Sequence, residues 1–282
     1  MKNILAIVLI ATSLLVQAQI QAPQPSPAAS VSTVVGLTDV KIDYSRPRAK
    51  GRKIFGAEPS FVVPFGAIWR TGANSGTKIT FSDNVKVEGI DVPKGEYLIF
   101  TWPGAAEWTI SLYKDIKLGG NTEGYDKTQE AANFKVKSEK LTEKVETLTF
   151  DISDIANDSK SAKVQLTWEN TSVKFTVGVD FDAKVMKSIE ANTKVNPGNL
   201  FQAASYYYEN GKDSKQALEW ATAAGAANAD AFWVFLLKAK IQKSLGDKKG
   251  AMDSSMASKA AAEKAKNTDY MKQNDEFQKG LK

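Results

Sequence analysis

Three arginines, one tryptophan, one asparagine and one threonine stand close together in the first third of the chain. They are Arg46, Arg52, Trp69, Arg70, Asn74 and Thr77. Guanidinium groups bind carboxylates and phosphates through paired hydrogen bonds, and an amide or a hydroxyl can complete such a site. We therefore predict that these six residues form a polar centre that binds a small anionic or glycan ligand.

The same residues also fit a structural role. An arginine can stack on the ring of Trp69 or Tyr44, and it can donate hydrogen bonds to the carbonyls of irregular loops. Gly51, Gly66 and Gly72 favour tight loops in either case. The residues leave two hypotheses open: a ligand pocket, or a set of contacts that holds loops together.

The chain contains no histidine and no cysteine. Ser-His-Asp and Cys-His catalysis are therefore excluded, and so are zinc sites built from thiolates or imidazoles. Hydrolysis of envelope glycans by a pair of carboxylates remains as the alternative function. The carboxylates considered are Asp43, Glu58, Glu96, Glu107 and Asp126, and none of them has a diagnostic spacing. No catalytic residue is assigned.

No cofactor and no metal site is predicted. Asp151, Asp154 and Asp158 resemble part of a calcium loop, but the glycine and the closing glutamate of an EF-hand are missing. We interpret these three aspartates as solvated turn residues.

Three aromatic side chains flank a predicted turn: Trp102, Trp108 and Tyr113. Such rings can form a flat platform for a sugar. Aromatic residues beside a hairpin also pack in its core or across the strand pair, and we favour that interpretation.

Residues 1–18 have the pattern of a cleavable export signal. Lys2 precedes a mostly apolar stretch from Ile4 to Val16, and Val16-Gln17-Ala18 matches a small-residue cleavage site. Residues 19–30 are rich in proline and small residues, which predicts a flexible lead-in. The apolar stretch is short for a membrane span. We expect a periplasmic or secreted protein that is not a lipoprotein and has no transmembrane span.

The charge of the chain says little about its partners. The formal net charge is +5, from 37 basic and 32 acidic residues. The basic residues are dispersed among acidic neighbours, which argues against a nucleic-acid-binding surface. We expect an unidentified protein partner or a small ligand, and no nucleic acid.

Residues 31–180 show the alternation of apolar and polar residues that is typical of strands. Tyr97–Trp102 and Trp108–Tyr113 flank Pro103-Gly104, which predicts a hairpin. Ala162–Trp168 and Ser172–Val179 flank Glu169-Asn170-Thr171, which predicts a second hairpin. One buried face per strand predicts a mainly β domain, an antiparallel β-sandwich or a partly open barrel.

Residues 196–282 show helical periodicity after a linker at 181–195 that we expect to be partly helical. Ala217 and Ala251 stand 34 residues apart, which is the tetratricopeptide period. Asp213 and Asp247 precede two of the predicted helices and can cap them. We predict two degenerate tetratricopeptide-like helical hairpins and a closing helix near Asp269–Leu281.

The β-rich part resembles a secreted bacterial family catalogued as domain of unknown function 2911, over about Pro25–Val177. The residues that carry the resemblance are Tyr44-Ser45-Arg46-Pro47, Gly51–Gly56, Val63-Pro64-Phe65-Gly66, Trp69–Asn74, Pro93–Thr101, Trp108-Thr109-Ile110 and Glu146–Phe150. Phe65 stands where the family commonly has tyrosine, and Tyr113 stands where asparagine is common. The resemblance implies no established activity.

These observations predict an exported, non-catalytic binding or scaffold protein. Its polar centre would lie on the β-domain, and its helices would form a surface that docks another protein. The alternative is a hydrolase or a binder that acts on envelope glycans.

Overall fold

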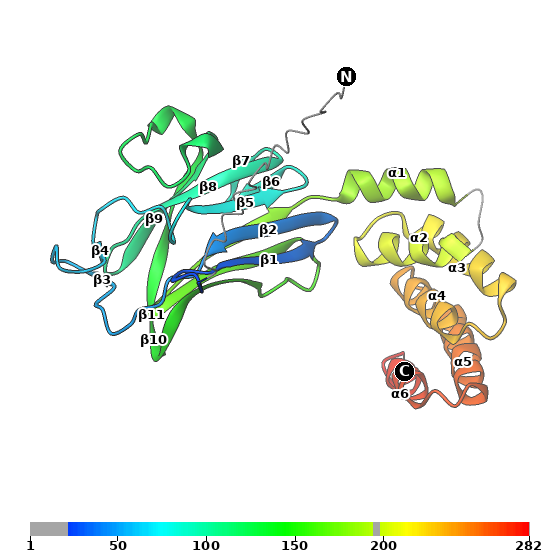
Figure 1. The fold of residues 1–282 in the computed structure, drawn as a ribbon. Coiled ribbons are helices and arrows are strands. Elements are labelled where there is room, and N and C mark those ends of the chain that lie inside the picture. Colours follow the sequence, from blue (N-terminus) through cyan, green and yellow to red (C-terminus); the bar gives the residue numbers. More distant parts are fainter. Residues whose placement is uncertain (1–21, 194–197, 282) are drawn as a thin grey trace, which may run out of the picture. The chain divides into compact units, whose positions relative to one another are not determined.

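A computed structural model describes residues 22–193 and 198–281 (Figure 1). The chain divides between Asp180 and Phe181 into two compact parts, which we call the β-rich unit and the helical unit. The predicted signal, the beginning of the lead-in and the Asn196-Pro197 boundary lie outside the described residues. None of the described helices is both long enough and apolar enough to cross a membrane.

The β-rich unit contains a nine-stranded antiparallel sheet, in agreement with the predicted fold class. Its strand order is β1-β2-β5-β8-β9-β10-β11-β6-β7, and a small parallel pair, β3-β4, lies outside it. The bounds are β1 Ala28–Val35, β2 Thr38–Ser45, β3 Phe55–Gly56, β4 Val63–Pro64, β5 Thr77–Phe81, β6 Val85–Val87, β7 Ile90–Val92, β8 Gly95–Trp102, β9 Glu107–Tyr113, β10 Glu130–Ser153 and β11 Ser161–Val179.

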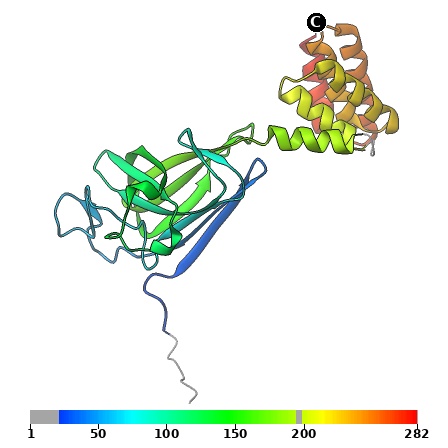
Figure 2. The same ribbon diagram turned by 90° about the horizontal axis from the view of Figure 1, so that it is seen from above.

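The long strand β10 makes the sheet curl back on itself. Its first part pairs with β9, from Glu130 to Lys137, and its second part pairs with β11, from Ser138 to Ser153. β1 thereby comes into contact with β10 and β11, although it lies at the other end of the strand order. Figure 2 shows this curl of the sheet. Apolar side chains of the strands, such as Ile42, Ile79 and Leu112, are fully buried. Among the described residues the strands do not close into a continuous barrel.

The predicted hairpin at Glu169-Asn170-Thr171 is wrong, because β11 runs through these residues without reversing. The buried side chains of β11 change there from even positions, such as Trp168, to odd positions, such as Val173. Glu169 has a left-handed backbone with φ of 53°, and the pairing with β10 is irregular opposite it. A bulge therefore shifts the alternation by one residue and bends the strand. The hairpin predicted around Pro103-Gly104 is confirmed by the pairing of β8 with β9.

The helical unit contains six helices within the described residues. They are α1 Asp182–Asn192, α2 Gly198–Glu209, α3 Ser214–Ala227, α4 Phe232–Ser244, α5 Lys248–Lys264 and α6 Thr268–Lys279. Asp213 accepts hydrogen bonds from the backbone N–H of Lys215 and Gln216, and Asp247 accepts one from Gly250. The two predicted caps are thus confirmed. Helix α1 occupies most of the predicted linker.

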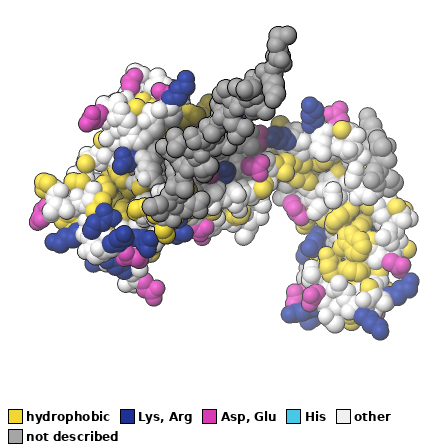
Figure 3. Space-filling model, viewed as in Figure 1, with side chains coloured by type: hydrophobic (Ala, Val, Ile, Leu, Met, Phe, Trp, Pro, Cys, Tyr) yellow, Lys and Arg dark blue, Asp and Glu magenta, His cyan; other side chains and the backbone are white. Residues whose placement is uncertain are grey.

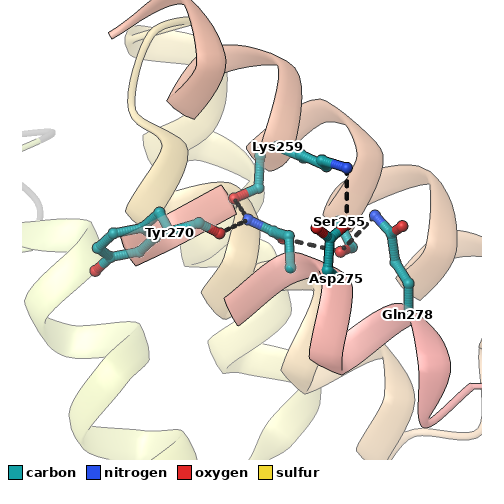
Figure 4. A network of polar contacts seen from close by, with 7 residues as sticks. Ser255, Lys259, Tyr270, Asp275 and Gln278 are labelled. Atoms are coloured by element: carbon teal, nitrogen blue, oxygen red, sulfur yellow. Dashed lines mark hydrogen bonds and ion pairs between the residues drawn. The ribbon is translucent and has the colours of Figure 1, made fainter. Parts of the chain in front are cut away.

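Buried hydrogen bonds join α6 to α5 (Figure 4). Asn274 is fully buried; its amide donates to the Ser258 hydroxyl and to the Tyr270 carbonyl, both at 2.8 Å. Its carbonyl oxygen accepts from the Ser255 hydroxyl at 2.8 Å. Polar groups thus take the place of a purely apolar contact between these helices.

Candidate functional site

The segment that follows β2 is attached to β10 by backbone and side-chain hydrogen bonds. Arg48 forms an antiparallel bridge with Thr147, and the Ala49 N–H donates to the Glu146 carbonyl at 2.7 Å. The Arg46 guanidinium donates to the Leu148 carbonyl at 3.1 Å and to the Thr149 hydroxyl at 2.8 Å. Arg46 therefore holds two distant parts of the chain together.

Arg52 closes its own turn. Its guanidinium donates to the Ala49 carbonyl at 3.1 Å and to the Arg48 carbonyl at 2.7 Å. Lys50 and Gly51 have φ of 49° and 73°, so the chain turns sharply before it reaches Arg52. Two of the five N–H donors of Arg52 are used in this way, and the side chain remains exposed.

Trp69 lies at the centre of a buried aromatic cluster. Its ring stacks on Trp168 with centroids 5.9 Å apart and planes inclined by 19°. Phe55 and Trp108 meet it edge-on, with centroids 5.5 Å and 6.2 Å away. The Trp69 backbone exchanges two hydrogen bonds with Thr101 of β8, at 2.8 Å and 2.9 Å. These contacts fix the start of the loop that carries Arg70.

The loop after Arg70 has a strained backbone. Thr71 has φ of 55°, which is a rare conformation for a β-branched residue. It is fully buried, and its hydroxyl lies within hydrogen-bond distance of the Trp69 carbonyl at 3.3 Å and of the Thr101 hydroxyl at 3.1 Å. The Thr77 hydroxyl donates to the Thr71 carbonyl. The surrounding hydrogen bonds thus hold Thr71 in an unfavourable conformation.

Asn74 joins the same loop to the beginning of the sheet. Its amide donates to the Ser45 hydroxyl at 3.0 Å and to the Ser26 carbonyl at 3.3 Å. Its own φ is 58°, a left-handed value that asparagine tolerates better than most residues. Asn74 therefore acts here as a loop contact.

A pocket of about 350 Å³ lies between these loops. Arg52, Arg70, Trp69 and Trp168 line it, together with Ser26, Pro47, Val62, Ile68, Gly72, Ala73 and Thr122. The Arg70 guanidinium is exposed and donates to the Gly120 carbonyl at 3.3 Å, which places the side chain beside the loop that contains Thr122. This volume is within the range of small-molecule sites.

Within residues 22–193 and 198–281, the two arginines that line the pocket form no ion pair with a carboxylate. No aspartate or glutamate is among the residues that line the pocket. None of the four arginines of the described part of the chain forms an ion pair. Residues 46–53 add five basic side chains and no acidic one. Figure 3 shows basic side chains gathered at the end of the β-rich unit where β3 and β4 lie.

The structure brings three of the six predicted site residues into one pocket. Arg52, Trp69 and Arg70 line it. Arg46, Asn74 and Thr77 do not line it, and their polar groups bind other parts of the protein. The two hypotheses thus apply to different residues. Arg46, Asn74 and Thr77 make contacts between loops, whereas Arg52, Trp69 and Arg70 form part of a pocket wall.

The candidate catalytic carboxylates are engaged elsewhere. Asp43, Glu96 and Glu107 form ion pairs with Lys41, Lys78 and Lys135 at 2.8–2.9 Å. None of the five carboxylates lines the pocket. Burial would raise the pKa of Asp43, but hydrogen bonds from Lys41 and Ser30 and nearby lysine charges hold it below its usual value.

Asp126 is also unsuited to be a general acid. Hydrogen bonds from the backbone and the hydroxyl of Thr128 lower the pKa of its carboxyl. An acid in glycoside hydrolysis needs a raised pKa, so the shift has the wrong direction. No cluster of three potential metal-ligating side chains is present among residues 22–193 and 198–281. Asp154, from the calcium-like run, pairs with Lys174 at 3.2 Å.

The proposed sugar platform is not formed. Trp108 and Tyr113 are buried, and Tyr113 packs against Phe100 and Tyr125. Trp102 is half-buried and meets Tyr125 edge-on, with centroids 5.2 Å apart. Two of the three rings therefore belong to the core, as the favoured interpretation expected.

Several pocket residues gave no signal in the sequence. Val62, Ile68 and Thr122 stand in irregular loops without periodicity, and Trp168 lies far along the chain on β11. The alternation of β11 placed Trp168 on a buried face, but it did not indicate which residues it would meet. Only the pairing of distant strands brings Trp168 to Trp69.

One comparison with known proteins gives a match. A family described as "Protein of unknown function (DUF2911)" matches residues 26–177, which covers the β-rich unit up to the end of β11. No curated protein and no solved structure matches the chain significantly.

Proposed function

The chain belongs to the DUF2911 family of proteins of unknown function, and we propose that it is a non-catalytic module that binds a small anion in the pocket bordered by Arg52 and Arg70. Trp69 supplies part of the wall, and Arg46, Asn74 and Thr77 keep the surrounding loops in place. The single observation that carries this proposal is that two guanidiniums without carboxylate partners line the same pocket.

Electrostatics supports this assignment. A guanidinium presents donors in a planar fork that matches the oxygens of a carboxylate or a phosphate. Arg52 and Arg70 use only some of their donors within the protein, which leaves others for a ligand. The neighbouring basic residues of segment 46–53 would raise the local concentration of anions by long-range attraction.

The strained backbone beside the pocket is a second support. A left-handed non-glycine residue costs on the order of 1–3 kcal/mol, and such residues are frequent at ligand sites. Thr71 lies between Arg70 and Gly72 in the sequence, and both of these neighbours line the pocket. The strain fixes the direction in which the backbone presents Arg70.

Replacement of single arginines tests the proposal. Arg70→Ala should weaken anion binding at least tenfold and leave the melting temperature nearly unchanged, because Arg70 is exposed and makes one hydrogen bond to a surface carbonyl. Arg48→Ala is the matched control, because this substitution removes the same charge from a residue that does not line the pocket. Equal binding by both variants would overturn the proposal.

We propose further that the helical unit is a tetratricopeptide-like scaffold that docks a protein partner. Ala217 and Ala251 are fully buried and are the fourth residues of α3 and α5, one period apart. Helix pairs α2-α3 and α4-α5 are in contact through α3 and α4, and α2 also contacts α4, as in stacked repeats.

A groove in this unit supports the docking role. It has a volume of about 620 Å³, and the apolar side chains of Met186, Ile189, Tyr207 and Trp220 are among those that line it. Figure 3 shows further apolar side chains on one face of the helical unit. Met186→Glu should abolish association with a partner, whereas Met256→Glu, on an exposed position outside the groove, should not. The same result from both variants would remove the groove from consideration.

We also propose that the protein works in the periplasm or outside the cell. The support is the sequence pattern of residues 1–18, with its apolar stretch and small-residue cleavage site. Mass spectrometry of the protein from its native cells should give a chain that begins at Gln19. A full-length chain in the cytoplasmic fraction would contradict this.

A further inference from the structure

We infer that the ligand of this pocket is an organic acid with a compact apolar body, in preference to a polyol or an inorganic anion. This inference rests on the proposed function, because it assumes that the pocket bordered by Arg52 and Arg70 is a binding site. It adds the chemical class of the ligand, and three features of the pocket wall lead to it.

Most of the polar side chains of the wall have hydrogen-bond donors and no acceptor. Arg52 and Arg70 have donors and no acceptor, and the indoles of Trp69 and Trp168 have one donor each. Both indole N–H groups are already used, by the carbonyls of Gly72 at 3.2 Å and Glu146 at 3.3 Å. Only the hydroxyls of Ser26 and Thr122 can accept as well as donate.

The backbone of the wall adds little accepting capacity. Six of its carbonyls already accept a hydrogen bond within the protein, the sixth being that of Ala73, which accepts from the Gly76 N–H. The other five are the carbonyls of Ser26, Pro47, Trp69, Arg70 and Gly72. A ligand with many hydroxyl groups would bring donors that find few partners, and unpaired buried donors cost free energy. A carboxylate brings acceptors only, which fits the wall.

The rest of the wall is apolar. Val62 is 40% exposed and lies on an exposed loop, and Ile68, Ala73 and the indole pair continue the apolar surface. Phosphate or sulfate would satisfy the arginines but would leave Val62 in contact with water. A hydrocarbon or aromatic body would cover Val62 and gain roughly 25 cal/mol for each Å² of apolar surface buried.

Four small probes separate the possibilities when added to the full-length protein. Benzoate combines a carboxylate with an apolar ring. Benzamide has the same shape without the charge, glucuronate has the carboxylate on a polyol, and inorganic phosphate has the charge alone. Binding is followed by the shifts of the tryptophan indole N–H signals in NMR spectra, because Trp69 and Trp168 line the pocket.

We expect benzoate to bind at least tenfold more tightly than each of the other three probes. Arg52→Ala and Arg70→Ala should each weaken benzoate at least tenfold, whereas Arg48→Ala should change its affinity less than twofold. Val62→Ser should weaken benzoate severalfold and leave phosphate unchanged. Val62 lies on an exposed loop, so this variant keeps the test valid if Arg52→Ala does not fold.

The outcomes distinguish the two proposals. Phosphate or glucuronate binding as tightly as benzoate, with the same dependence on Arg70, would overturn the organic-acid inference and leave the anion site intact. Binding of benzamide equal to that of benzoate would show that the charge of the ligand plays no part, and would overturn both proposals. Absence of binding for all three anions would overturn both the inference and the proposed function.

Discussion

Trp69 and Trp168 stack with their ring centroids 5.9 Å apart, and both side chains line the pocket that Arg52 and Arg70 border. One indole comes from an early loop and the other from β11, the last strand of the unit. The contact makes the hydrophobic core continuous with the floor of the pocket. Changes in this cluster should therefore affect both stability and binding.

We predict that Trp168→Phe destabilises the β-rich unit more than Trp108→Phe. The Trp168 indole donates to the Glu146 carbonyl at 3.3 Å, whereas the buried Trp108 indole N–H is without a hydrogen-bond partner among the described residues. Phenylalanine at 108 removes an unsatisfied donor, so part of the lost packing is offset. The difference should be at least about 1 kcal/mol in urea unfolding. Equal losses would contradict this account.

Arg46→Ala should lower stability without changing anion affinity. It removes hydrogen bonds from a charged donor to Leu148 and Thr149, which together contribute about 1–3 kcal/mol. The side chain does not line the pocket, so the dissociation constant for benzoate should change less than twofold. Chemical denaturation and NMR titration of the same sample check both statements. A loss of affinity as large as that of Arg70→Ala would place Arg46 in the binding site.

Gly72→Ala should cost more than Gly51→Ala. Both glycines have positive φ, 138° at Gly72 and 73° at Gly51. Alanine costs about 1–2 kcal/mol in the left-handed region near the φ of Gly51, and φ of 138° lies outside even this region. At Gly72 an added Cβ would also lie 3.0 Å from the Thr77 hydroxyl and 3.4 Å from the Ser45 carbonyl, whereas nothing lies within 4 Å at Gly51. Thermal unfolding of the two variants measures the difference, and a reversed order would show that the loop relaxes freely.

Tyr125 should make the protein less stable at alkaline pH. Burial, followed by the hydrogen bond to Glu130, raises the pKa of its phenol above the ordinary value of 10.0. Above pH 10 the unfolded chain loses this proton while the folded chain keeps it. The contribution of the protonated Tyr125 to the free energy of unfolding is therefore fully present below pH 10. Above pH 10 it declines by up to about 1.4 kcal/mol per pH unit.

The comparison that isolates this effect is Tyr125→Phe. This variant lacks the phenol. Between pH 10 and the highest pH at which the protein remains folded, its free energy of unfolding should therefore fall less steeply than that of the unsubstituted protein. Urea unfolding at a series of pH values gives both slopes. Identical slopes would mean that Tyr125 ionises as readily in the folded state as in the unfolded one.

Asn274→Ala should release α6 from α5. The substitution removes the hydrogen bonds to Ser255, Ser258 and Tyr270, and it leaves the Ser255 hydroxyl without its buried acceptor. The expected cost is about 1–3 kcal/mol, confined to the helical unit. Hydrogen exchange should accelerate in Thr268–Lys279. Gln273→Ala, on the exposed side of the same helix, should have little effect. Unchanged protection in Asn274→Ala would contradict the assigned role of the network.

The bipartite fold followed from local patterns in the sequence. Alternating residues gave the β8–β9 hairpin, and the aspartates at 213 and 247 gave the starts of α3 and α5. Such features depend on neighbours along the chain. The path of β11 was mistaken because a bulge and a turn both interrupt the alternation, and only the partner strand decides between them.

The pocket was predictable in part. Arginine and tryptophan in one short segment indicated a polar centre near Arg70, but the sequence could not divide the arginines between loop contacts and pocket wall. That division depends on which carbonyls are within reach, for example Leu148 for Arg46 and Gly120 for Arg70. These pairs are set by the curl of the sheet.

The bridge between Arg48 and Thr147 closes a very long stretch of chain, and Pro47 and Arg52, on either side of Arg48 in the sequence, line the pocket. Contacts between residues so distant in sequence form slowly, because the entropy of the intervening chain must be lost first. An occupant of the pocket binds only the finished architecture, so it stabilises that state by mass action. If the proposed anion site is occupied, its ligand therefore adds to the free energy of unfolding of the β-rich unit.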